Sequence, residues 1–133
     1  MPRPKMPYPT PAELEILKIL WENGPLTVRD VMEDLKDRNK DRAYTSVMSL
    51  LGVMADKKLL SRTRQGRAFV YAAKLPREKT LSGLVGDLWK RAFDGSTSSL
   101  VAHLLNQASP SEEELAAIRL AIAAYESDRE EQP

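Results

Sequence analysis

Residues 42–72 of this chain read RAYTSVMSLLGVMADKKLLSRTRQGRAFVYA. The first half has an apolar residue at every third or fourth position, which is typical of an amphipathic helix. The second half contains two short segments, 60–65 and 67–72, separated by a turn at Gln65-Gly66, which predicts a β-hairpin. The stretch therefore predicts a helix that leads directly into a hairpin.

The predicted helix covers residues 42–57 and has two different faces. The apolar face, expected to point into the core, carries Tyr44, Val47, Leu51 and Met54. The opposite face carries Thr45, Ser46, Ser49, Gly52 and Val53. Because each of them stands in an apolar periodic pattern, four aromatic residues are also expected in the core: Trp21, Tyr44, Phe69 and Tyr71.

Two shorter helices are predicted upstream. Thr10-Pro11-Ala12-Glu13 combines a threonine cap, a proline at the first helical position and a glutamate that can close a capping box, and Asn23-Gly24-Pro25 ends this helix. Thr27 and Asp30 predict the start of a second helix, followed by a loop over residues 36–41. Three helices followed by a hairpin predict a winged helix-turn-helix domain over residues 1–75.

Residues 76–133 are predicted to be helical only. Apolar residues at three- and four-residue steps run from Leu81 to Phe93, Asp94-Gly95-Ser96 breaks the pattern, and a short helix follows around residues 100–105. Ser109-Pro110-Ser111-Glu112 repeats the cap signature before a last helix, whose polar tail from Glu126 is expected to fray. The expected fold class is thus mainly α with a small β-hairpin.

The role expected for residues 76–133 is dimerisation. Helices this short carry few large side chains each, so a core shared between two chains is favoured over packing within one chain, which stays the alternative. The residues expected to be buried between chains are Leu84, Leu88, Trp89, Leu100, Leu104, Ile118 and Ile122.

Charge is divided unevenly along the chain. Residues 1–75 carry 14 Lys and Arg against 9 Asp and Glu, whereas residues 76–133 carry 6 against 10. No acidic residue occurs between Lys57 and Arg77. Such a run is often only a solvated face, but beside a helix-turn-helix it indicates nucleic-acid binding.

A helix held across a two-helix scaffold can enter the major groove of DNA with its N-terminal side chains against base edges, while a basic hairpin contacts the backbone. The residues expected to bind double-stranded DNA are Arg42, Thr45, Ser46, Ser49, Lys57, Lys58, Arg62, Arg64 and Arg67. The alternative is a winged-helix module that binds another protein and never contacts DNA, because a fold does not fix its function.

Several other classes of protein are disfavoured. The 133-residue chain has no Cys and only one His, His103, so a metal site or another cofactor is not expected. No His, metal site or phosphate loop accompanies the Ser, Asp and Glu residues, so the chain is not expected to be an enzyme. Without a membrane-span-length apolar run or a signal-peptide-like start, we expect a soluble cytoplasmic protein with no membrane insertion.

The chain resembles the penicillinase repressor family of BlaI and MecI type. The resemblance rests mainly on Thr10 to Ile16 with Leu20-Trp21, on Ala43-Tyr44-Thr45-Ser46-Val47, on Leu59-Leu60 and on Gly66 to Tyr71, and it covers nearly the whole chain. It implies a homodimeric repressor of resistance or stress genes. In this family the third helix reads bases of a palindromic operator and the wing contacts the backbone.

The sequence departs from the family pattern at three places. The absence of Cys disfavours the copper-sensing CopY branch. Val53 and Lys58 stand where the family commonly has Arg and Gly. The family also implies a partner, a sensor-linked protease that cuts an Asn-Phe bond, and His103-Leu104 stands there in this chain, so regulation by cleavage is left open.

Overall fold

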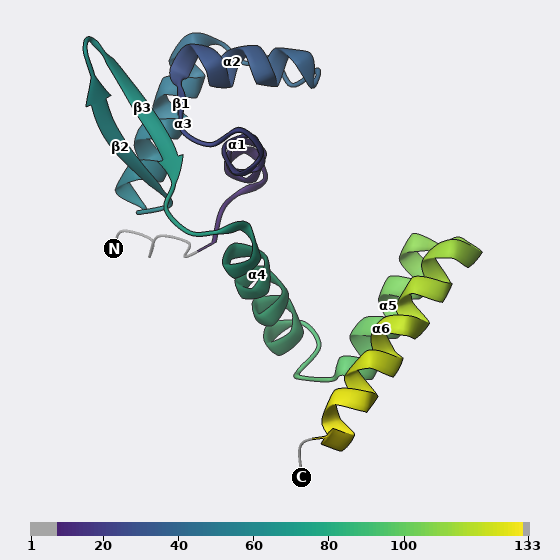
Figure 1. Ribbon diagram of the computed structural model, residues 1–133. Helices are drawn as coiled ribbons and strands as arrows, with labels where there is room; N and C mark the ends of the chain where they lie inside the picture. Colours follow the sequence, from purple (N-terminus) through teal and green to yellow (C-terminus); the bar gives the residue numbers. More distant parts are fainter. Residues whose placement is uncertain (1–7, 132–133) are drawn as a thin grey trace. The chain divides into compact units, whose positions relative to one another are not determined.

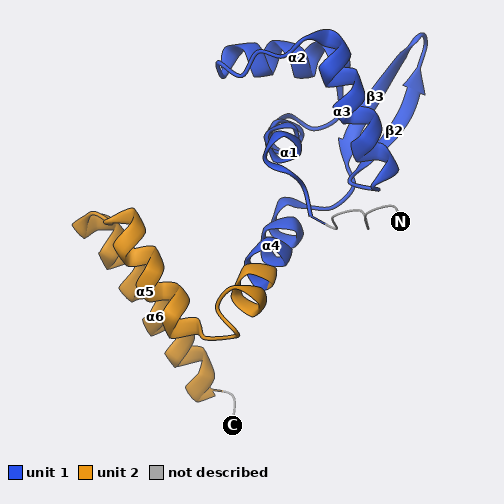
Figure 2. Ribbon diagram, turned by 180° about the vertical axis from the view of Figure 1, so that it is seen from behind, with its two compact units in different colours: residues 1–86 blue, residues 87–133 orange. Residues whose placement is uncertain are grey.

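The computed structural model describes residues 8–131, which divide into two compact units (Figures 1 and 2). The first unit ends at Gly86 and the second begins at Asp87. The division therefore falls inside helix α4 (Arg77–Arg91), eleven residues beyond the boundary at residue 75 that the sequence suggested. The functional boundary between a DNA-binding part and a dimerisation part stays a prediction.

The first two helices begin where their capping residues predict. In α1 (Pro11–Asn23), the Thr10 hydroxyl accepts from the Glu13 amide at 3.2 Å, and the Glu13 carboxylate accepts from the Thr10 amide at 2.8 Å. Thr27 and Asp30 form the same reciprocal pair at the start of α2 (Val28–Asp37). Both boxes satisfy amides that a helix start leaves unpaired.

Helix α3 (Tyr44–Asp56) buries three of the four residues expected on its inner face, Val47, Leu51 and Met54. The fourth expectation is wrong, because Tyr44 is 53% exposed. Tyr44 is the first residue of the helix, and helical side chains tilt toward the N-terminus. Its ring therefore projects beyond the core instead of into it.

A three-stranded antiparallel sheet completes this unit, with the strand order β1-β3-β2. The hairpin consists of β2 (Leu60–Gln65) and β3 (Ala68–Ala73), joined by Gly66 and Arg67. The turn lies one residue later than expected, with Gly66 at a φ of +62°, which glycine adopts readily at the first position of a two-residue turn. The two-residue β1 (Leu26–Thr27) was not predicted, because it is too short to show a period.

The core of the first unit gathers one face of each of these elements. Its buried apolar residues are Ile16, Leu17, Ile19, Leu20, Val31, Leu35, Val47, Leu51, Met54, Leu60 and Tyr71. Trp21 packs against this cluster, and its indole N–H donates to the Leu75 carbonyl at 3.0 Å. The expected core position of Tyr71 is thus confirmed and Trp21 is partly buried at the edge of the core, whereas Phe69 is 38% exposed and its expected core position is wrong.

One buried polar residue, Glu13, stands at the edge of this core with 2% of its surface exposed. Its carboxylate accepts from the Lys57 ammonium group at 2.7 Å as well as from the Thr10 amide. Burial raises the pKa of the Glu13 carboxyl, but the hydrogen bonds from Lys57 and Thr10 outweigh burial and hold the pKa below its ordinary value of 4.5. The pair links the start of α1 to the residue after α3.

The second unit contains the end of α4 and the helices α5 (Thr97–Ala108) and α6 (Glu112–Glu131), which run in opposite directions (Figure 1). Ser111, not Ser109, accepts from the Glu114 amide at the start of α6, while Ser109 ends α5 in the left-handed region at a φ of 45°. The expected frayed tail is also wrong up to Glu131, because α6 continues to that residue.

No residue of α4, α5 or α6 is buried within this chain. Apolar side chains are instead exposed along all three helices, among them Val85, Leu88, Val101, Leu104, Leu120, Ile122 and Tyr125. In the part of the chain from residue 8 to residue 131, no helix combines the length and the apolar character needed to cross a membrane.

We expect Glu13→Gln to lower the free energy of unfolding by roughly 3 kcal/mol at pH 7, because it leaves the largely buried Lys57 ammonium without its counter-charge. The matched control is Glu15→Gln on the same helix, which breaks only a 3.5 Å pair with Lys18 at the surface and should cost less than about 1 kcal/mol. Urea unfolding of the three proteins measures both differences.

The same variant tests the pH dependence. A carboxyl whose pKa is lowered by folding stabilises the native state above pH 4.5 and loses this contribution as the pH falls through the folded-state pKa. Wild type should therefore lose stability more steeply than Glu13→Gln below pH 4.5. Equal slopes for the two proteins would contradict the role assigned to the Glu13 carboxylate.

Candidate nucleic-acid interface

The N-terminal half of α3 presents the side chains that the sequence singled out as base readers. Thr45, Ser46 and Ser49 are all exposed, on the side of the helix away from Val47 and Leu51. Residue Ala43, which precedes the helix, forms no side-chain cap, in contrast to Thr10 and Thr27. The positive end of the α3 dipole is thus left open for an anion such as a phosphate.

The hairpin brings two arginines onto the face of the sheet that bears the core. In the register of β2 and β3, Arg62 lies opposite Tyr71 and Arg64 lies opposite Phe69. Directly paired residues project from the same face of a sheet, and Tyr71 on that face is buried. Arg62 and Arg64 therefore project to the same side as the core helices.

The ring of Phe69 supports both guanidinium groups. The Arg62 Cζ atom lies 4.7 Å from the ring centroid and the Arg64 Cζ atom lies 6.0 Å from it. The Nε–H of Arg64 also donates to the Gly66 carbonyl at 3.2 Å. These contacts give the exposed Phe69 a physical role, because cation–π contacts orient long, flexible cationic side chains. Sequence reasoning missed this role, although a two-residue turn at Gly66-Arg67 would have paired Phe69 with Arg64.

Further exposed cations lie before α3, after α3 and in the hairpin turn. Arg42 precedes α3, Arg67 occupies the hairpin turn, and Lys58 follows α3 with a φ of +65°. All three are exposed, as is Arg29 of α2, which the sequence analysis did not select. Within residues 8–131, none of these four side chains forms an ion pair, and neither does Arg62 or Arg64.

Lys57 does not join this surface, and its expected place among the DNA contacts is corrected. Its side chain is 11% exposed and its ammonium group is bound to Glu13. Moving it to a phosphate would leave the Glu13 carboxylate buried without a partner, which is costly. Lys57 is therefore a structural residue, and Lys58 is the exposed cation at this end of α3.

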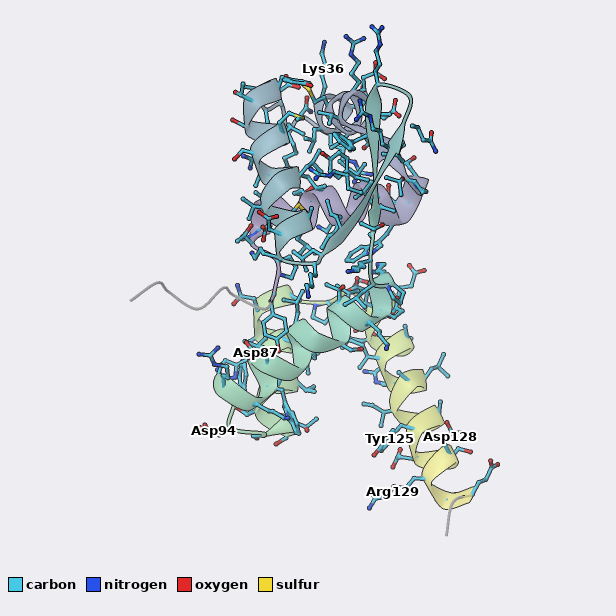
Figure 3. The ribbon with its side chains drawn as sticks, turned by 90° about the vertical axis from the view of Figure 1, so that its left-hand side faces the viewer. Lys36, Asp87, Asp94, Tyr125, Asp128 and Arg129 are labelled. Atoms are coloured by element: carbon cyan, nitrogen blue, oxygen red, sulfur yellow. The ribbon has the colours of Figure 1, made fainter. Side chains whose placement is uncertain are left out.

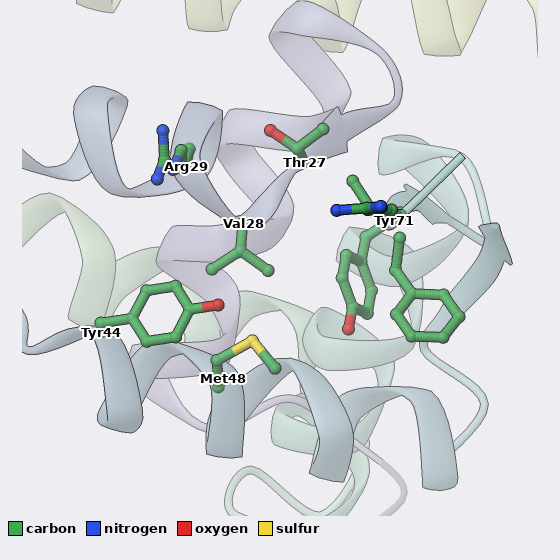
Figure 4. A pocket seen from close by; sticks show the side chains of 9 residues that line it. Thr27, Val28, Arg29, Tyr44, Met48 and Tyr71 are labelled. Carbon is green, nitrogen blue, oxygen red and sulfur yellow. The ribbon is translucent and has the colours of Figure 1, made fainter. Parts of the chain in front are cut away.

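A crevice separates α3 from the hairpin (Figure 4). Tyr44 and Met48 rise from α3 toward Val28, with Tyr71 across from them. The residues that line it come from β1, α2, α3 and the hairpin: Thr27, Val28, Arg29, Tyr44, Met48, Arg67, Ala68, Phe69 and Tyr71. The crevice has apolar walls and two arginines, Arg29 and Arg67, among its lining residues.

The model of one protein family, described as penicillinase repressor, matches residues 9–124. This chain belongs to the penicillinase repressor family. The membership confirms the family that the motifs of the sequence indicated and the function expected with it, a DNA-binding transcriptional repressor. The members of this family are regulators of transcription, and such regulators are not a class of enzymes.

Two relatives illustrate the similarity. The transcriptional regulator BlaI of Mycobacterium tuberculosis is 34% identical over 123 residues, which cover 91% of this chain and 87% of the relative. The penicillinase repressor of Bacillus licheniformis is 23% identical over 111 residues, which cover 84% of this chain and 86% of that protein. Both matches extend beyond the winged helix into the C-terminal helices.

Among solved structures, the DNA-binding domain of the repressor BlaI is similar to this chain with a TM-score of 0.49 and 25% identity. The match covers 55% of this chain and 88% of that domain. The monomeric form of Bacillus licheniformis BlaI, determined in complex with the blaP half-operator, matches with a TM-score of 0.47 and 24% identity over 56% of this chain and 89% of that one.

The Phe69 ring offers a direct test of this interface. We expect Phe69→Leu to weaken binding to duplex DNA several-fold, because Arg62 and Arg64 lose the ring that orients them. The free energy of unfolding should change far less than for a core substitution, since Phe69 is already partly exposed. Fluorescence anisotropy with a labelled duplex measures the affinity, and urea unfolding the stability.

A double-mutant cycle supplies the control. In a background of Arg62→Ala and Arg64→Ala, Phe69→Leu should have little further effect on DNA binding, because the two groups it orients are gone. An undiminished loss in that background would show that Phe69 acts independently of the two arginines.

Proposed function

We propose that this repressor binds an inverted-repeat operator as a homodimer, with one α3 helix of each protomer in successive major grooves. The observation that carries the proposal is the exposed N-terminal half of α3, flanked by cations that no acidic side chain neutralises within the described residues. Two such helices would lie about 34 to 36 Å apart, so the half-sites should be one helical turn apart or a simple multiple of it.

The roles within each half-site follow from charge and position. Thr45, Ser46 and Ser49 face base edges, where hydroxyl groups donate and accept hydrogen bonds. Arg42, Lys58, Arg62, Arg64 and Arg67 contact the phosphate backbone, which supplies most of the affinity and little sequence information. Because its proposed ligand is DNA inside the cell, the proposed place of action of this repressor is the cytoplasm.

The C-terminal helices supply the dimer interface of the proposal. Leu88, Leu104, Ile118 and Ile122 are exposed in a single chain, and Leu84, Trp89 and Leu100 are only half-buried. Other exposed apolar residues of α6, such as Leu120 and Tyr125, add to this surface, and Figure 3 shows Tyr125 projecting from the end of α6. So much exposed apolar surface on one protomer favours burial against a second copy.

The proposal also includes a second partner, a protease whose cleavage of the chain would release the repressor from DNA. The peptide bond between His103 and Leu104 lies inside α5, where His103 stacks edge-on against Phe93 with ring centroids 5.1 Å apart. A protease binds an extended segment, so cleavage here requires local unfolding of α5.

Arg64→Ala should weaken binding to operator and to unrelated duplexes by a similar factor, because the residue contacts the backbone rather than bases. The slope of log K against log salt should become less steep by about 0.9, the value for one phosphate contact. Arg91→Ala is the matched control, since Arg91 is an exposed arginine of α4 outside the proposed interface. An unchanged slope for Arg64→Ala would remove the hairpin from the interface.

The rival function is that of a winged-helix module that binds another protein. It would be favoured if the chain bound a protein partner independently of salt and shifted no DNA fragment in a gel assay. The family membership makes DNA the first ligand to test. Selection of bound duplexes from a random pool provides the operator needed for every measurement.

Leu104→Glu should convert the dimer to a monomer, because it places a charge on the apolar face of α5 that the second protomer covers. Sedimentation at micromolar concentration measures the change, and affinity for a full palindrome should fall more than affinity for a half-site. Gln107→Glu, which adds the same charge at an already polar and exposed position of α5, should stay dimeric. A monomeric wild type at high micromolar concentration would contradict the proposal.

A further inference from the structure

The surface that α3 offers to a ligand is uncharged. Residues 44–55 contain no Arg, Lys, Asn, Gln, Asp or Glu, and Asp56 at the end of the helix is its one charged residue. The helix therefore lacks the side chains that form paired hydrogen bonds with guanine or adenine in the major groove. If it discriminates between bases, it does so with hydroxyl groups and apolar side chains.

Two of those apolar side chains are large and exposed at the N-terminal end. Tyr44 is 53% exposed and Met48 is 37% exposed, and residues four apart lie one above the other on a helix. Both line the crevice beside the hairpin and project to the same side (Figure 4). Neither belongs to the buried core, so the packing of the core does not explain why an apolar side chain stands at these two exposed positions.

The charges around this pair indicate what covers it. Arg42 precedes α3, and Arg29 and Arg67 line the same crevice, so the surroundings attract a polyanion. In duplex DNA, the C5-methyl group of thymine is the apolar feature of the major groove. An apolar pair at the start of a groove-entering helix, ringed by cations that hold the backbone, is complementary to those methyl groups.

We propose that Tyr44 and Met48 are specificity-determining residues that read thymine methyl groups in each half-site. The inference rests on the proposed function, since it assigns these side chains within the same DNA-bound helix. Thr45 and Ser49, the next residues along the chain, then hydrogen-bond to neighbouring base edges. The half-site core should consequently be selected for A·T pairs with thymine at defined positions of one strand, and G·C pairs should be read weakly.

Deoxyuridine substitution tests the inference without changing base pairing. Replacing one thymine at a time in the selected operator removes only the methyl group and leaves the O4 acceptor in place. At the contacted positions affinity should fall about fourfold per methyl group. This factor corresponds to the transfer free energy of one buried carbon. At the other thymines, and in unrelated duplexes, the replacement should have little effect.

Variants of Tyr44 and Met48 show which of the two side chains contacts which thymine methyl group. Met48→Ala should abolish the deoxyuridine effect at one thymine position, and Tyr44→Ala should abolish it at a neighbouring one. Met48→Leu keeps an apolar side chain of similar size and should restore the effect that Met48→Ala removes. Urea unfolding checks that the variants fold, which we expect because both side chains lie outside the core.

The outcomes separate this inference from the function on which it rests. Failure to select or bind any duplex would overturn the proposed function. Sequence-specific binding that tolerates deoxyuridine at every thymine would leave that function intact and overturn the inference. Deoxyuridine effects that persist in both alanine variants would assign the methyl groups to other side chains, which also overturns it.

Discussion

The ion pair between Glu13 and Lys57 is the buried polar contact on which the connection between α1 and the end of α3 depends. The Glu13 carboxylate closes the capping box at the start of α1. It also accepts a hydrogen bond from Lys57, the residue that follows α3. One buried carboxylate thereby joins the start of α1 to the end of α3, beside the apolar core to which both helices contribute. Because the opposite end of α3 carries the candidate base readers, this contact supports the candidate DNA surface from the far end of the helix.

Charged and uncharged side chains occupy different parts of this candidate DNA surface. Helix α3, the candidate base-reading helix, is uncharged up to Ala55, whereas the exposed cations lie before it, after it and on the hairpin. Such a division separates backbone affinity from base discrimination, since phosphate contacts carry no sequence information. Phe69 links the two parts physically, as it contacts Arg62 and Arg64 and lines the crevice beside Met48.

The second unit, in contrast to the first, has no buried core of its own within the described part of a single chain. None of its helices has a buried residue, although the pattern of Leu, Ile and Val along them is that of core helices. Small helical units without their own core gain stability by association. In the proposed dimer, folding of this half and dimerisation are one process, which makes the stability of the repressor depend on its concentration.

The sequence by itself determined the order of the elements, the starts of α1 and α2, and the hairpin, because capping boxes and a two-residue turn at glycine act over a few neighbouring residues. It also identified the exposed hydroxyl groups of α3, the hairpin arginines and the family. Only the tertiary structure decided that Tyr44 and Phe69 are exposed, that Lys57 is bound to Glu13, and that β1 pairs with β3. Those features depend on which distant element covers a side chain or supplies its partner, and a local pattern carries no information about that.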